Sequence, residues 1–219
     1  WQLLDAEGRE LLAGEAEGSI AFHLDDIRLW HSEDPYLYTL VMHCGDEWIV
    51  EKIGVRKAYV ENGVVKINGV AIKFKGVNRH DSDPYTGTVC DMEHMLRDLK
   101  IMKRHNVNAI RTSHYPNDPR FLQLCDKYGF YVFDEADIET HGMNCLQWEY
   151  MAERPEWRES ILDRVQMMVE RDKNRPCVMM WSMGNESGYG ANFEAAIDWC
   201  HQRDSRYVHY EGVNDYSVY

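Results

Sequence analysis

The chain has 219 residues, of which 44% are hydrophobic and 12% aromatic, so it is long enough to bury a core and is not disordered in composition. Its formal net charge is −13 at pH 7, and no run of Lys or Arg exceeds two residues. This balance argues against nucleic acid or an anionic membrane as a partner, because both select basic surfaces. No apolar run approaches the ~20 residues that cross a bilayer.

Six cysteines are scattered along the chain without a Cys-x-x-Cys pair or a zinc-like spacing. This distribution favours buried free thiols in a reducing compartment. The sequence opens at Trp1 rather than Met, so we expect an internal fragment of a longer protein. We expect a cytoplasmic location, with a periplasmic or secreted one left open because the true N-terminus is not in the sequence.

In chain order, the first 61 residues read as short strands separated by turn signals such as Asp34-Pro35 and Gly45-Asp46. The candidate strands are 19–24, 37–43 and 47–51. They predict a piece of an antiparallel sandwich that is too short to be complete. Asn62-Gly63 and Asn68-Gly69 follow, and Asn-Gly next to apolar runs is a strong hairpin signal.

From residue 72 onward, short apolar runs alternate with amphipathic helices. Apolar side chains in 92–102 recur at spacings of three and four, as on one face of a helix. Asp118-Pro119 opens another helix, and Gly129 closes it. The predicted strands are 72–77, 108–112, 130–134, 178–182 and 207–210. The predicted helices begin at 92, 118, about 155 and 192.

Five strands and four crossover helices fit either an open doubly wound sheet or the first part of a (β/α)8 TIM barrel. The strands are almost continuously apolar, as buried parallel strands are. The glycine fingerprint of a nucleotide-binding fold is missing after the first strand, where the residues at 76–80 read Gly-Val-Asn-Arg-His. The barrel is therefore the predicted fold, with residues 62–219 as the N-terminal portion of a catalytic domain.

Ionisable and polar residues follow four of the predicted strands. In a barrel, such positions meet at one face and form the active site. Packing of a core does not by itself require charged residues at only one end of the strands. Polar residues after four separate strands therefore favour a functional interpretation. The residues are Asn78, Arg79 and His80, then Arg111, Ser113 and His114, then Glu135, Glu139 and His141, and finally Asn185 and Glu186.

Glu186 is the strongest catalytic candidate. It follows a buried strand and lies between Gly184 and Gly188, which allow a tight turn and leave room for a substrate beside the carboxyl group. A carboxyl group placed this way suits a proton donor. The alternative interpretation is a glutamate that caps the next helix.

Glu139 and His141 are two residues apart, so in an extended loop their side chains point the same way. Together with Glu186 they can form a divalent-metal site. Oxygen-rich ligands favour Mg²⁺ or Mn²⁺, and the imidazole shifts the preference slightly toward Mn²⁺. A plain hydrogen-bonded pair remains open as the alternative.

Four segments together resemble family 2 glycoside hydrolases, in particular the large bacterial β-galactosidases of the Lac and Ebg type. The resemblance extends over nearly the whole chain and identifies residues 1–61 as the C-terminal part of an immunoglobulin-like β-sandwich. The segments are Gly76-Val-Asn-Arg-His80, Arg111-Thr-Ser-His-Tyr-Pro116, Asp134-Glu-Ala-Asp-Ile-Glu-Thr-His-Gly-Met143 and Trp181-Ser-Met-Gly-Asn-Glu-Ser187.

The resemblance implies a retaining β-galactosidase that works as a homo-oligomer when complete. It assigns the general acid/base to Glu186 and a role in binding the galactosyl group to His80 and His114. The other roles it implies are support of the nucleophile by Arg111, a hydrogen bond to the sugar 2-hydroxyl from Asn185, and ligation of Mg²⁺ by Glu139, His141 and Glu186. A monovalent cation is also expected, but its ligands are not recognisable in this sequence.

Two departures from the family pattern concern the substrate. Asp137 replaces an asparagine of the Lac enzyme, and the loop after Met143 differs from its counterpart, which puts the aglycone preference in doubt. The family's nucleophile follows strand seven, beyond this sequence, so the 219 residues alone are expected to be inactive. An open barrel also exposes strand edges that favour aggregation.

Three alternatives remain. A β-glucuronidase or another family 2 glycosidase shares several motifs, but a glucuronidase typically has Pro where Ser187 follows Glu186. A non-catalytic carbohydrate-binding or complementing fragment would bind galactose without hydrolysing it. A metal hydrolase of the amidohydrolase type usually needs His-x-His on the first strand, and Asn78-Arg79-His80 does not provide it.

Overall fold

The computed structural model describes residues 1–145 and 151–213, and the chain divides into two compact units. The first comprises 1–73 together with 126–129, and the second comprises 74–125 together with 130 onward. Within the described residues, no helix is long and apolar enough to span a membrane.

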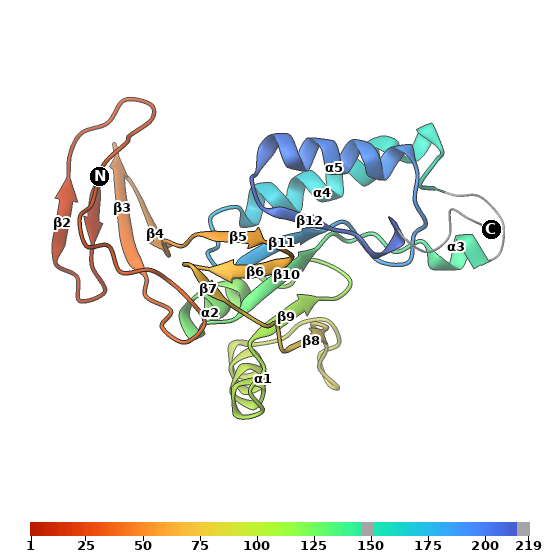
Figure 1. The fold of residues 1–219 in the computed structure, drawn as a ribbon, viewed down its shortest axis with the longest axis horizontal. Helices are drawn as coiled ribbons and strands as arrows, with labels where there is room; N and C mark the ends of the chain where they lie inside the picture. The colour runs from red at the N-terminus through yellow and green to blue at the C-terminus, as the bar shows by residue number, and fades with distance from the viewer. Residues whose placement is uncertain (146–150, 214–219) are drawn as a thin grey trace. The chain divides into compact units, whose positions relative to one another are not determined.

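The first unit contains two antiparallel sheets (Figure 1). The larger has the strand order β2-β1-β3-β4, and the smaller has the order β5-β6-β7. The strands of the larger sheet are β1 (Gln2–Leu4), β2 (Glu10–Ala13), β3 (Tyr38–Cys44) and β4 (Glu47–Ile53). Those of the smaller sheet are β5 (Ala58–Glu61), β6 (Val64–Ile67) and β7 (Val70–Ala71).

The hairpin predicted at Asn68-Gly69 is confirmed, and Asn62-Gly63 forms a second one. Asn62 and Gly63 have φ angles of 52° and 75°, and Asn68 and Gly69 have φ angles of 52° and 86°. Two consecutive positive φ angles are what a tight type I′ turn requires, and Asn followed by Gly adopts them at little cost. The turns join β5 to β6 and β6 to β7.

The strand predicted at 19–24 is wrong: these residues form no strand, and Ile20 and Phe22 are exposed. Phe22 stacks on Trp1 with ring centroids 5.4 Å apart, so its apolar side chain packs locally rather than on a sheet. The core of this unit instead contains Trp30, whose Nε1 donates a hydrogen bond to the Asp126 carbonyl at 2.8 Å. The immunoglobulin-like assignment and the boundary between residues 61 and 62 stay predictions.

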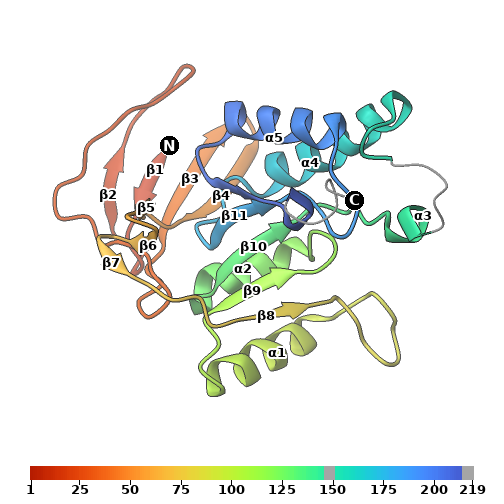
Figure 2. The ribbon, with the colours of Figure 1, turned by 45° about the vertical axis from the view of Figure 1, so that its right-hand side comes forward.

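The second unit contains a five-stranded parallel sheet in the order β8-β9-β10-β11-β12, so each strand pairs with its successor in the chain (Figure 2). A doubly wound sheet would reverse its direction of growth at a switch point, whereas a barrel adds strands in sequence order. The predicted TIM-barrel architecture is therefore confirmed. The strands are β8 (Gly76–Arg79), β9 (Ala109–Thr112), β10 (Tyr131–Glu135), β11 (Val178–Ser182) and β12 (Tyr207–His209).

The four predicted helices are confirmed. The Asp91 side chain caps the first by accepting a hydrogen bond from the backbone N–H of His94, and Gly129 follows the second with a φ of 73°. A short helix over 141–145 was not predicted. The elements are α1 (Met92–Arg104), α2 (Pro119–Tyr128), α3 (His141–Cys145), η1 (Pro155–Trp157), α4 (Arg158–Asp172), α5 (Ala191–Arg203) and η2 (Glu211–Val213).

The first barrel strand begins later than predicted, at Gly76 rather than Ile72. Its register pairs Gly76 with Ala109, and a side chain added at Gly76 would lie 3.3 Å from Ala109. The middle strands are the most buried, with Ile110 and Val132 fully enclosed. Because the five strands are parallel, their carboxyl ends meet along one edge of the sheet, where the predicted site residues come together.

Of the six cysteines, five are described and all five are free thiols. Cys90, Cys125, Cys177 and Cys200 are buried, and Cys44 is exposed. Burial raises the pKa of the Cys200 thiol to about 12, which keeps this side chain protonated and unreactive. The side chain of Cys145 lies outside the described part of the chain.

Candidate active site

Glu135 is the centre of the polar network at the carboxyl end of the sheet. It is the last residue of β10, and its side chain is fully buried. Its carboxylate accepts hydrogen bonds from Arg111 Nε at 2.5 Å, His114 Nδ1 at 2.7 Å and Ser182 Oγ at 2.6 Å. Three donors from neighbouring strands and loops offset the cost of burying this charge.

Arg111 connects Glu135 to the residues before Glu186. Its Nη2 donates to Asn185 Oδ1 at 2.9 Å, and Asn185 Nδ2 in turn donates to Glu139 Oε1 at 3.1 Å. Glu139 and Asn185 also form an isolated parallel bridge through their backbones. The strand ends of β9, β10 and β11 are thus joined by one chain of hydrogen bonds.

His80 and His114 lie together, as the resemblance implies for two residues that contact one sugar. Their rings pack edge to face with centroids 5.4 Å apart. Both line a cavity of about 350 Å³, to which Glu139 also contributes. Trp157 at the end of η1 also lines it. The cavity lining therefore combines polar groups with an aromatic ring.

Glu186 lies on a constrained turn after β11. Its φ of 40° is in the left-handed region, which is uncommon for a residue other than glycine. Its backbone N–H donates to Glu211 Oε1 at 2.6 Å, and its side chain is half-exposed. Gly184 has a φ of 136°, and a side chain there would lie 2.7 Å from the Ile138 carbonyl, so only glycine fits.

The three residues predicted to bind Mg²⁺ have the right donor atoms but do not converge. His141 Nδ1 lies 3.3 Å from Glu186 Oε2, whereas Glu139 accepts its hydrogen bond from Asn185. Among the described residues, no three His, Cys, Asp or Glu side chains are grouped closely enough to hold a metal ion. The oxygen-rich donor set suits Mg²⁺ in chemistry, and the hydrogen bond from Asn185 uses only Oε1 of the Glu139 carboxylate.

Two further residues of the network, Ser182 and His209, were not predicted from the sequence. Ser182 Oγ contacts His209 Nδ1 at 3.0 Å. The serine gives its single hydrogen to the Glu135 carboxylate, so the His209 ring nitrogen must be the donor in this contact. Burial, followed by the nearby Arg111 charge, lowers the pKa of His209. The positions of Ser182 and His209 at strand ends were the available signal.

Asn78 faces a different space from His80. It lines a second cavity of about 530 Å³ together with Arg111, Phe133 and His209. Strand residues alternate between the two faces of a sheet, so Asn78 and Arg79 point to opposite sides. Asn78 is therefore on the same side as the Glu135 network.

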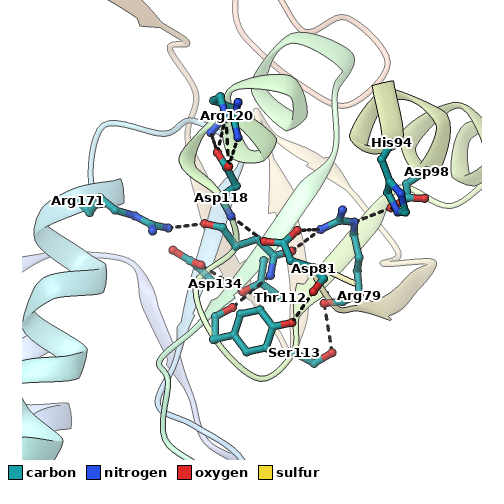
Figure 3. A network of polar contacts seen from close by, with 12 residues as sticks. Arg79, Asp81, His94, Asp98, Thr112, Ser113, Asp118, Arg120, Asp134 and Arg171 are labelled. Atoms are coloured by element: carbon teal, nitrogen blue, oxygen red, sulfur yellow. Dashed lines mark hydrogen bonds and ion pairs between the residues drawn. The ribbon is translucent and has the colours of Figure 1, made fainter. Parts of the chain in front are cut away.

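Arg79 is a strand-end residue that does not reach this site. Its guanidinium is buried against the Phe121 ring of α2 at 3.9 Å. Nη1 donates to Asp81 Oδ1 at 2.6 Å and to Asn117 Oδ1 at 2.8 Å, and Nε donates to Asp98 Oδ2 of α1 at 3.0 Å (Figure 3). Arg79 therefore joins the sheet to its helices.

A matching family model, described as "Glycosyl hydrolases family 2, TIM barrel domain", covers residues 58–219. A β-galactosidase of Actinobacillus pleuropneumoniae is 47% identical over 96% of this chain, and one of Lactococcus lactis is 48% identical over 95%. The chain spans only 24% and 21% of these two relatives.

Solved structures give the same fold. A β-glucuronidase from Ruminococcus gnavus in complex with uronic isofagomine matches 94% of this chain and 37% of its own, with a TM-score of 0.83 and 28% identity. A β-glucuronidase of Faecalibacterium prausnitzii matches 95% of this chain and 36% of its own, with a TM-score of 0.75 and 31% identity. The chain belongs to family 2 of the glycosyl hydrolases, within the TIM barrel domain of that family.

Proposed function

We propose that the full-length protein is a retaining glycoside hydrolase that removes terminal β-D-galactosyl residues from lactose-type β-galactosides. The observation that carries the proposal is the hydrogen-bonded array at the strand ends, in which Arg111 joins Glu135 to Asn185, the residue before Glu186. The β-galactosidases that are 47% and 48% identical support the choice of sugar.

Glu186 is proposed as the general acid and then the general base. A retaining enzyme needs two carboxyl groups roughly 5 Å apart, one as nucleophile and one that exchanges the proton. Glu186 would protonate the glycosidic oxygen as a glycosyl–enzyme ester forms, and then deprotonate the water that breaks the ester. The nucleophile is proposed to lie outside these 219 residues, so this part alone is expected to be inactive.

The other residues bind and orient the sugar in this proposal. His80 and His114 line the cavity and would contact the galactosyl group, and Asn185 would donate to the 2-hydroxyl. Arg111 already contacts Asn185 and would also support the nucleophile. Hydrogen bonds that become stronger in the transition state at the 2-hydroxyl contribute to the rate in this enzyme class.

Mg²⁺, or Mn²⁺ in its place, is proposed to bind Glu139, His141 and Glu186. Such an ion would tune the acidity of the bound carboxyl group and fix its orientation. The contact between His141 and Glu186 supports two of the three ligands. Removing divalent ions with a chelator should lower the galactosidase activity, and added Mg²⁺ should restore it. Unchanged activity after complete chelation would contradict this part of the proposal.

A β-glucuronidase is the second candidate, because the β-glucuronidase structures share this fold with TM-scores up to 0.83. Ser187 argues against it, since glucuronidases typically have Pro after the catalytic glutamate. A carbohydrate-binding or complementing role without catalysis is the remaining alternative. The cytoplasmic location and the homo-oligomeric state are also proposals, the latter open to sedimentation analysis of the full-length protein.

The test compares hydrolysis of aryl β-galactoside, β-glucuronide and β-mannoside by the full-length protein, before and after Glu186→Ala. We expect the galactoside to be preferred and the variant to lose activity that azide partly restores. Azide is an anionic nucleophile that needs no general base, so it can attack the glycosyl–enzyme ester in place of water, forming a glycosyl azide and releasing the enzyme carboxylate. Glu194→Ala, an exposed glutamate on α5, is the matched control and should behave as the wild type. Full activity of Glu186→Ala would refute the mechanism, whereas a different preferred sugar would refute only the specificity.

A further inference from the structure

We infer that Glu135 is a positioning residue, which holds Arg111 and His114 in the orientations that sugar binding and catalysis require. The inference deepens the proposed function and rests on it. Glu135 is fully buried. The proposed mechanism gives it no part in the chemical step.

Glu135 sets the tautomer of His114. A carboxylate only accepts hydrogen bonds, so the contact of 2.7 Å requires His114 Nδ1 to carry a hydrogen. In the neutral ring, Nε2 is then left as an acceptor. His114 lines the cavity beside His80, so Glu135 determines that His114 offers an acceptor to a sugar hydroxyl group.

Glu135 also orients the Arg111 guanidinium. Its Nε is bound by Glu135 and its Nη2 by Asn185, so the guanidinium is held at two points. Because Asn185 Oδ1 accepts from Arg111, the amide must direct Nδ2 outward, where it now meets Glu139. Glu135 thus fixes through Arg111 which end of the Asn185 amide is a donor, one residue before Glu186.

Burying the Glu135 carboxylate has a cost in free energy. A fully buried carboxylate is retained only when it is well paired, and Ser182 provides the third donor at 2.6 Å. All three donors lie toward the carboxyl ends of the neighbouring strands: Arg111 on β9, Ser182 on β11 and His114 in the loop after β9. Hydrogen bonds from groups at the site therefore help to offset the cost of burying the Glu135 carboxylate.

The experiment measures kcat and KM separately for Glu135→Gln in the full-length protein. Glutamine keeps the shape but turns one acceptor into an NH2 group that faces a donor of Arg111, His114 or Ser182. Misplacement of positioned groups by about 1 Å can cost about 10²-fold in rate, and we expect kcat/KM to fall by that order. Ser182→Ala, a milder variant that keeps Glu135, should lower kcat/KM less.

The matched control is Asp134→Asn, the neighbouring fully buried carboxyl group on the opposite face of β10. It should leave kcat and KM unchanged. The second readout is non-additivity: Glu135→Gln should cost much less in a His114→Gln background than in the wild type, because both act through one contact. A purely structural role would make the two effects multiply.

Crystal structures of wild type and Glu135→Gln provide a readout that does not depend on which sugar is hydrolysed. Displaced Arg111 and His114 side chains are expected. If the wild type prefers another sugar, the specificity fails but the kinetic test proceeds on that sugar. Glu135→Gln that keeps kcat and KM within twofold of the wild type, with both side chains in place, would overturn the inference.

Discussion

Asp134 and Glu135 are adjacent in the chain, and both are fully buried, yet they belong to networks on opposite faces of β10. Glu135 binds donors that extend to the cavity lined by His114. Asp134 accepts from Thr112 Oγ1 at 3.2 Å and lies near Asp172 at the end of α4. The comparison indicates that one face of β10 contributes Glu135 to the site, whereas the other contributes Asp134 to a network between the sheet and its helices. Figure 3 shows Asp134 and Thr112 of that second network.

Thr112 is the point where the two networks meet. Its hydroxyl group donates a hydrogen bond to Asp134 Oδ1 and accepts one from the backbone N–H of Glu135 at 2.9 Å. If Glu135 serves the site and Asp134 serves the fold, substitutions between the sheet and its helices should lower the free energy of unfolding and change kcat and KM little. Each of the following measurements uses the full-length protein.

The largest effect is expected for Arg79→Met. The variant leaves the Asp81 and Asp98 carboxylates without their buried cation, so we expect a loss of about 3–5 kcal/mol in the free energy of unfolding. Denaturant titration measures it. The control is Arg120→Met, which removes the exposed ion pair to Asp118 and should cost at most about 1 kcal/mol. Equal losses of unfolding free energy in the two variants would contradict the expectation that the buried ion pairs of Arg79 contribute more than the exposed pair of Arg120.

A smaller effect is expected for Gly184→Ala, which tests the turn between β11 and Glu186. The φ of 136° and the close approach to the Ile138 carbonyl predict strain of about 1–3 kcal/mol. Because the turn positions Asn185 and Glu186, kcat should fall together with the unfolding free energy. Gly142→Ala, where an added side chain meets no atom of the described residues within 4 Å, is the control. A normal kcat in Gly184→Ala would show that the turn tolerates the shift.

The smallest effect is expected for Asp134→Asn and concerns pH. Burial, with the nearby Asp172 charge, raises the pKa of Asp134 well above its usual value. The folded protein therefore keeps a proton that the unfolded chain releases above about pH 3.9, so this group's contribution to stability falls as pH rises from there toward the raised pKa. The variant should have nearly the same free energy of unfolding as the wild type near pH 4. As pH increases, its free energy of unfolding should fall less than that of the wild type. Parallel stability curves in thermal unfolding would contradict this.

The sequence predicted the periodic parts of the fold well. Helical spacing of apolar residues, the Asp118-Pro119 start and the Gly129 end are local signals, and the helices agree with them. The strand predicted at 19–24 was wrong: these residues form no strand, and Phe22 packs on Trp1 rather than on a sheet. Alternation of apolar and polar residues in a short segment cannot distinguish packing on a sheet from packing on a single aromatic side chain.

The candidate site was predicted only in part. His80 and His114 come together as expected, and Asn185 and Arg111 are hydrogen-bonded. Arg79, which also follows a strand, instead faces the helices. Glu135 was recognised as a strand-end residue, but its central place in the network depends on donors from 24 and 47 positions away in the chain.

By itself, the sequence determined the order of strands and helices, the turns and the set of polar groups at the strand ends, because periodicity and turn chemistry act over a few residues. Only the tertiary structure decided which of these groups face the cavity and which join the sheet to its helices. The physical reason is the two-residue alternation of a strand: a shift of one position sends a side chain to the opposite face, and pairing with neighbouring strands determines that register.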